Sequence, residues 1–144
     1  MNPTAAVMRR VLRGSRDQVF AAWSDPHLMA QWFFVEPGWC AQVENEFRVG
    51  GSYTIEMRTG NDALFVIFGE YREIVRDSKI VFTWNSPLVQ NTLVTIELRA
   101  LGAQTELTLT HELFPDAAAR ERDAGGWQGC LDNLARFLEI RYGV

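Results

Sequence analysis

The chain has 144 residues, a net charge of −4 at neutral pH and an ordinary share of apolar and charged residues. This length predicts one domain, residues 1–144, with enough core to fold without a disulfide or a metal. Lysine occurs once, at Lys79, and there is no basic run, so we expect no nucleic-acid partner. The sequence shows neither a signal peptide nor an apolar stretch of about 20 residues. We therefore expect a cytoplasmic protein with reduced thiols and no membrane insertion.

The first part of the chain predicts one strand and two short helices. Residues 5–13 alternate loosely, as a strand does. A helix over residues 15–23 follows, with Ser15 as its N-cap and apolar residues at helical spacing. Asp25 is placed to cap a second helix, residues 26–33, which begins at Pro26.

From residue 40 to residue 113 the apolar period changes to two, which predicts a meander of six strands. The expected strands are 40–47, 52–58, 63–75, 79–84, 91–100 and 104–113. The alternation indicates an antiparallel sheet with one apolar face. Strand 63–75 is apolar on both faces at first, so the residues leave open which face lines the interior. A contact between two copies, and hence a homodimer, is a further interpretation of this strand.

The last segment, from Pro115 to Tyr142, predicts a long helix that covers the apolar face of the sheet. Each glycine inside such a helix costs about 1 kcal/mol relative to alanine. Gly126 lies at the edge of the apolar arc, where we expect it to let the backbone approach the sheet. Gly129 lies outside the arc, and the pattern gives no packing reason for it. Spacing predicts a modest ion pair between Asp132 and Arg136.

The order β-α-α-β6-α indicates an α+β fold. Five segments carry a more specific signal: VFAAWSDPHLMAQWF, FRVGGSYTIEM, GEYREIVRDSKIVFTW, TELTLTHEL and GGWQGCLDNLARFLE. In this order they resemble the SRPBCC superfamily, which includes START lipid-transfer domains and the birch pollen allergen. Within it they resemble the branch of homologues of activators of the heat-shock-protein ATPase. The resemblance covers about residues 7–140.

The resemblance implies a helix-grip fold, in which a curved antiparallel sheet wraps around a long C-terminal helix and encloses a cavity. Members of the superfamily hold lipids, hormones or aromatic compounds, and some are enzymes, so the fold alone does not give the activity. The chaperone role belongs to relatives with an additional N-terminal domain. The sequence shows no such domain, so we do not expect an interaction with a chaperone.

The aromatic content, with five Trp and nine Phe, predicts a pocket for a small hydrophobic or aromatic molecule. In this fold the same residues can also be plain core. The residues expected to contact the ligand are Trp32, Trp39, Tyr53, Met57, Trp84, His111, Trp127, Cys130, Leu131 and Leu134. No set of His, Cys, Asp and Glu has the spacing of metal ligands, so we expect neither a metal nor a cofactor.

His111 is the sharpest candidate for chemistry, since it lies on the inward face of its strand and histidine titrates near neutral pH. The alternative is a structural histidine that is hydrogen-bonded inside the protein. Cys130 faces inward as well, and an inert buried thiol is its simpler interpretation. Ligand binding is the favoured function. The alternative is a small-molecule enzyme of the cyclase, dehydratase or hydrolase type that uses His111.

Overall fold

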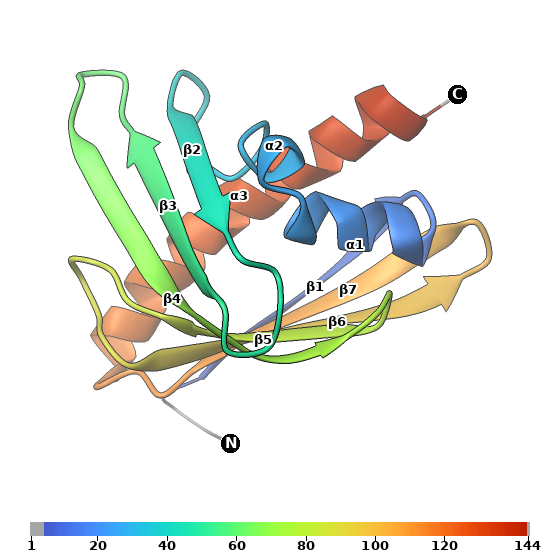
Figure 1. Ribbon diagram of the computed structural model, residues 1–144. Coiled ribbons are helices and arrows are strands. Elements are labelled where there is room, and N and C mark those ends of the chain that lie inside the picture. Colours follow the sequence, from blue (N-terminus) through green and yellow to red (C-terminus); the bar gives the residue numbers. More distant parts are fainter. Residues whose placement is uncertain (1–4, 144) are drawn as a thin grey trace.

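The computed structural model describes residues 5–143, and the order of its elements is the predicted one (Figure 1). The elements are β1 (Ala6–Arg13), α1 (Arg16–Ser24), α2 (Pro26–Met29), β2 (Cys40–Asn45), β3 (Ser52–Arg58), β4 (Leu64–Val75), β5 (Lys79–Trp84), β6 (Thr92–Leu101), β7 (Gln104–Glu112) and α3 (Ala117–Tyr142). The predicted strands and the last helix are confirmed to within three residues at either end. The predicted α+β helix-grip architecture is confirmed.

All neighbouring strands pair antiparallel in one sheet of order β1-β7-β6-β5-β4-β3-β2. The six later strands form the predicted meander. The first strand crosses to the far side and pairs with the last, so that Ala6 lies opposite His111. The first and last strands of the sequence are therefore neighbours in the sheet, and β1 and β2 form its two edges.

The sheet curls around α3, which runs diagonally across its concave side (Figure 1). Strict alternation produces this arrangement, because alternate strand residues point to opposite faces. In β7, for example, Leu107 and Leu109 are fully buried against the helix, whereas Thr108 and Thr110 face the other way. The helix α1 lies on the same concave side, against β6 and β7.

Aspartate side chains cap the N-termini of α2 and α3. Asp116 Oδ1 accepts the backbone N–H of Ala119 at 2.8 Å and begins α3. Asp25 caps α2 in the same way. The prediction that α2 continues to residue 33 is wrong, because the helix ends at Met29. The following turn instead brings Trp32 and Phe33 into the core, where both are completely buried.

The glycines of α3 do not have the roles that the apolar arc suggests. A Cβ on Gly126 would meet only Val35 Cγ2, at 3.8 Å, which is an ordinary contact. A Cβ on Gly129 would lie 2.1 Å from the carbonyl oxygen of Val35, which no real side chain tolerates. The close approach is therefore made at Gly129, to the loop before β2 rather than to the sheet. The prediction for Gly126 was wrong.

The predicted Asp132–Arg136 pair is also wrong. Asp132 pairs with Arg10 of β1 at 2.7 Å, and Arg136 contacts Asn133. Asn133 was not expected in the core, and its side chain donates to the carbonyl oxygen of Phe34 at 2.6 Å. The helix is thus tied by polar contacts to β1 and to the loop after α2.

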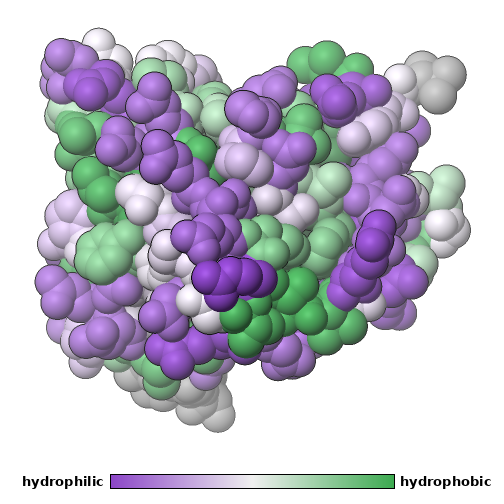
Figure 2. Space-filling view, in the orientation of Figure 1, coloured by the Kyte–Doolittle hydropathy of each residue, from purple (hydrophilic) through white to green (hydrophobic). Residues whose placement is uncertain are grey.

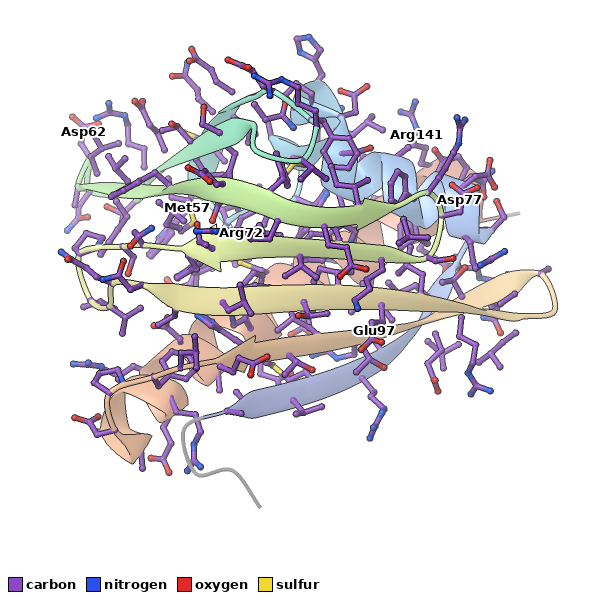
Figure 3. All side chains as sticks on the ribbon, turned by 60° about the horizontal axis from the view of Figure 1, so that its bottom comes forward. Met57, Asp62, Arg72, Asp77, Glu97 and Arg141 are labelled. Atoms are coloured by element: carbon purple, nitrogen blue, oxygen red, sulfur yellow. The ribbon has the colours of Figure 1, made fainter. Side chains whose placement is uncertain are left out.

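The outer face of the sheet is largely polar. Figure 3 shows Arg72 and Glu97 on this face, with α3 behind the sheet. Two apolar residues of β4, Leu64 and Phe68, are about half exposed there, while Ile67 of the same strand points inward and is buried. The inner face of β4 is therefore the one that carries Ile67, and the homodimer suggested by the outer face remains a prediction.

Most of the face shown in Figure 2 is hydrophilic, and hydrophobic residues gather low in the middle, where the connection between β2 and β3 lies. Val49 belongs to this connection and is 59% exposed. The helices within residues 5–143 include none that is both long and apolar enough to span a membrane.

Candidate functional site

An open pocket of about 250 Å³ lies between the inner face of the sheet and the N-terminal half of α3. Its walls are mostly apolar. It is lined by Phe33, Val35 and Trp39 from the segment before β2, by Met57 of β3, by Phe65 and Ile67 of β4, by Trp84 of β5, by Ser86, Pro87 and Leu88 after β5, and by Arg122, Asp123, Gly126, Trp127 and Cys130 of α3.

The periods of the helix and the strands bring these residues together. Asp123, Trp127 and Cys130 are spaced by four and three residues, so they share one face of α3. Met57 lies directly opposite Phe65 in the β3–β4 ladder, on the inner face of the sheet. The pocket therefore lies between one face of α3 and the inner face of strands β3, β4 and β5.

Aromatic rings form much of the wall. Trp84 and Trp127 face each other across the sheet–helix boundary, with ring centroids 4.8 Å apart. Trp39 stacks on Phe65, with centroids 5.9 Å apart and an angle of 11° between the rings. Such rings offer flat apolar surfaces to a planar ligand.

His111 lies behind this wall, completely buried, and both of its ring nitrogens are occupied. The indole N–H of Trp127 donates to Nδ1 at 2.9 Å. Nδ1 is therefore the unprotonated nitrogen, and Nε2–H donates to Thr92 Oγ1 at 2.8 Å. The Thr92 hydroxyl in turn donates to the carbonyl oxygen of Trp84 at 2.8 Å. Every hydrogen-bonding group in this chain of contacts is satisfied.

Burial lowers the pKa of His111 from 6.5 to about 3, so the ring is neutral at physiological pH. Its Nδ1 lies 4.0 Å from Asp123 Oδ2. This contact is not an ion pair, because the ring is uncharged and the facing nitrogen already accepts a hydrogen bond. The geometry supports the structural interpretation of His111, in which the ring fixes the orientation of Trp127.

Asp123 is the unusual group of the pocket. Its side chain is only 10% exposed, and Oδ2 is buried without a hydrogen-bond partner among the described residues. Burial raises the pKa of this carboxyl from 3.8 to about 6, against an opposing effect of Arg122. An unpaired buried carboxyl is costly, and such groups are rare in folded proteins.

Cys130 contributes a buried thiol to the pocket. Burial raises its pKa to about 12, which leaves it protonated and unreactive at neutral pH. Within residues 5–143, no three His, Cys, Asp or Glu side chains gather closely enough to hold a metal ion.

The sequence-predicted ligand contacts fall into two groups. Those that line the pocket are Trp39, Met57, Trp84, Trp127 and Cys130. Those that are buried in the core around it are Trp32, Tyr53, His111, Leu131 and Leu134.

Two residues of the second group have structural partners of their own. The indole N–H of Trp32 donates to the carbonyl oxygen of Ala22 at 3.0 Å. The Tyr53 hydroxyl donates to the carbonyl oxygen of Thr83 at 2.5 Å. The first contact joins the turn after α2 to α1, and the second joins β3 to β5.

Sequence reasoning did not select Arg122 and Asp123 as pocket residues, and it left open whether Phe65 and Ile67 line the cavity, as they do. The signal for Asp123 was available, since it lies four residues before Trp127 and so one turn earlier on the same face of the helix. A carboxylate near the start of a helix is normally solvated. The loop after β5 lines the same pocket as Asp123, and the helix pattern does not indicate that.

Comparison with protein families identifies the chain. Residues 13–139 match the family described as activator of Hsp90 ATPase homolog 1-like protein. The chain belongs to this family. This result agrees with the resemblance carried by the five sequence segments. A comparison with curated proteins gives no match.

Several solved structures have the same fold as this chain. A protein from Chromobacterium violaceum is 30% identical, with a TM-score of 0.86 over 95% of this chain and 98% of its own. A protein from Nitrosomonas europaea is 20% identical, with a TM-score of 0.82 over 99% and 98% of the two chains. A protein from Aeromonas hydrophila described as AHSA1-like is 20% identical, with a TM-score of 0.83 over 94% and 92%. The fold is therefore preserved along nearly the whole chain.

Proposed function

We propose that this protein binds a small hydrophobic, mainly aromatic molecule in the pocket between the sheet and α3. The observation that supports this most directly is an open space of about 250 Å³ walled by indole and phenyl rings. An engineered apolar cavity of about 150 Å³ already takes up benzene. A compound with one or two rings therefore suits the size of this pocket.

Binding is favoured over an enzyme that uses His111 by the state of that ring and of the Cys130 thiol. An enzyme of the cyclase, dehydratase or hydrolase type needs an acid–base group that reaches the substrate. His111 makes hydrogen bonds through both nitrogens and does not line the pocket. The Cys130 thiol is held protonated by burial. We do not extend the chaperone role in the family's description to this chain, because our proposal rests on an internal pocket.

Mass spectrometry of the purified protein under native and then denaturing conditions tests the proposal first. We expect a defined small molecule that is retained in the native protein and released on unfolding. The native mass also tests the predicted homodimer. If the native mass is that of the chain alone, binding has to be measured with added compounds.

A matched pair of variants at adjacent positions then tests the location of binding. Gly126 lines the pocket, whereas Gly125 does not, and an added Cβ at Gly125 meets nothing within 4 Å. Leucine at either position improves helix propensity by about 1 kcal/mol. Only Gly126→Leu places the added side chain in the pocket.

We expect Gly126→Leu to weaken binding of 2-naphthol, measured by fluorescence titration, by at least about tenfold, which is 1.4 kcal/mol. Gly125→Leu should bind as the wild type does. Equal binding by the two variants, with both folded by circular dichroism, would place the ligand elsewhere and contradict the proposal.

A further inference from the structure

Two buried polar atoms on pocket-lining side chains have no hydrogen-bond partner among the described residues: Nε1 of Trp84 and Oδ2 of Asp123. Only the second belongs to an ionisable group. Asp123 Oδ2 is excluded from solvent and makes no hydrogen bond with any described residue. The carboxylate belongs to a pocket-lining side chain that is nine-tenths buried. Buried polar atoms are almost always hydrogen-bonded, so this exception calls for an explanation.

The neighbouring protein groups do not supply that partner. His111 approaches Oδ2 from β7 at 4.0 Å, but its facing nitrogen already accepts the N–H of Trp127 and has no proton to give. Arg122 of α3 also lines the pocket, and its charge lowers the pKa of Asp123 without forming a hydrogen bond or an ion pair with it. None of these described groups supplies the donor, so the carboxylate is available to a donor on a ligand.

The walls next to this carboxylate suit a cation. Trp127 lies one helical turn after Asp123, and Trp84 lies with its ring 4.8 Å from that of Trp127. Indole faces attract ammonium groups, most strongly where water is excluded. A carboxylate oxygen accepts an ammonium N–H in a strong, charge-assisted hydrogen bond.

We propose that the pocket recognises an amine, with its ring or hydrocarbon body against the indole rings and its ammonium N–H donating to the carboxylate of Asp123. This inference rests on the proposed binding function and adds the chemical class of the ligand. Asp123 is then the group that distinguishes an amine from a neutral or acidic compound of the same shape.

Three probes of nearly equal size test the inference: 2-phenylethylamine, propylbenzene and 3-phenylpropanoate. They share a phenyl body and differ in the group at its end, which is cationic, apolar or anionic. Isothermal titration calorimetry at pH 7.5 gives the affinity of each. We expect the amine to bind at least about tenfold more tightly than propylbenzene, since hydrogen bonds to charged groups are strong.

Asp123→Asn should abolish this preference while leaving propylbenzene binding within about twofold. Glu121→Gln is the matched control, because it removes the same charge from the same helix at a side chain that is 75% exposed and outside the pocket. The control should keep the wild-type preference. A preference lost equally in both variants would reflect the overall charge of the protein and would overturn the inference.

The remaining outcomes separate the two proposals. If propylbenzene binds as tightly as the amine, the pocket binds apolar molecules and the role of Asp123 is overturned. If 3-phenylpropanoate binds most tightly, the ligand is an acid held by Arg122, which also overturns it. If none of the three probes binds, the amine inference fails together with the proposed function.

Discussion

The two halves of α3 differ in what lies beneath them. Under the C-terminal half, Leu131, Leu134 and Leu138 are completely buried in a closed core. Under the N-terminal half, from Arg122 to Cys130, the same helix borders an open pocket. Leucine side chains fill the first region, whereas indole and phenyl rings line the open space of the second. Between α3 and the sheet, the space for a ligand therefore lies along the N-terminal half of the helix.

The two regions also differ in how their polar groups are satisfied. Under the closed half, the buried amide of Asn133 donates to a backbone carbonyl. At the pocket, the carboxyl of Asp123 has no such partner. Two of the buried side-chain atoms that lack a partner among the described residues, Asp123 Oδ2 and Trp84 Nε1, thus belong to residues that line the pocket.

The largest effect that separates the two regions is expected from a pair of isoleucines. Ile96 lies in the closed core and Ile67 lines the pocket, and both are almost completely buried. Ile96→Ala should lower the free energy of unfolding by about 4 kcal/mol, because it leaves a closed cavity. Ile67→Ala should cost about 2 kcal/mol, since its methyl groups already contact open space on one side. Urea denaturation measures both, and equal losses would mean that the pocket is filled in solution.

An intermediate effect is expected at Asp123. Because its pKa is raised from 3.8 to about 6, the folded protein binds more protons than the unfolded chain between these values. Stability therefore falls as the pH rises from 4 to 6, and the loss persists above pH 6. Asp123→Asn removes this cost and should raise the free energy of unfolding at pH 7 by at most about 3 kcal/mol, at about 1.4 kcal/mol per unit of pKa.

His111 has the opposite effect on the pH dependence of stability between pH 4 and pH 6, which provides a second test of Asp123. Its pKa is lowered from 6.5 to about 3, so acidification below pH 6.5 favours the unfolded chain, which takes up the proton. In the wild type, Asp123 partly offsets this loss. We expect Asp123→Asn to lose stability more steeply than the wild type between pH 6 and pH 4. Parallel curves would show that Asp123 titrates normally and has a partner in solution.

The smallest effects are expected from the glycines, and they have opposite signs. Gly129→Ala places a Cβ against the carbonyl oxygen of Val35 and should cost about 2 kcal/mol, as overpacking does. Gly125→Ala meets nothing within 4 Å and should gain about 0.5–1 kcal/mol from helix propensity. Thermal unfolding of the two variants decides this directly. Stabilisation by Gly129→Ala would contradict the close approach of α3 to the loop before β2.

Much of this architecture follows from local patterns in the chain. The alternation of Leu107 and Leu109 with Thr108 and Thr110 sets one face of β7 against the helix, and Asp116 marks the start of α3. These signals can be read from sequence because they depend on residues a few positions apart. The five segments that resemble the family add the curvature of the sheet and the presence of a cavity, which periodicity alone does not give.

The site depended on contacts between distant segments. Nothing near Gly129 in sequence indicates that the carbonyl oxygen of Val35 lies against it. The hydrogen bond from Trp127 to His111 likewise joins the helix to β7. By itself the sequence determined the elements, their order and the apolar face, since those follow from periods of two and 3.6 residues. Only the tertiary structure decided which aromatic residues line open space and which are core, and that Asp123 is buried without a partner, because burial depends on what packs above a residue.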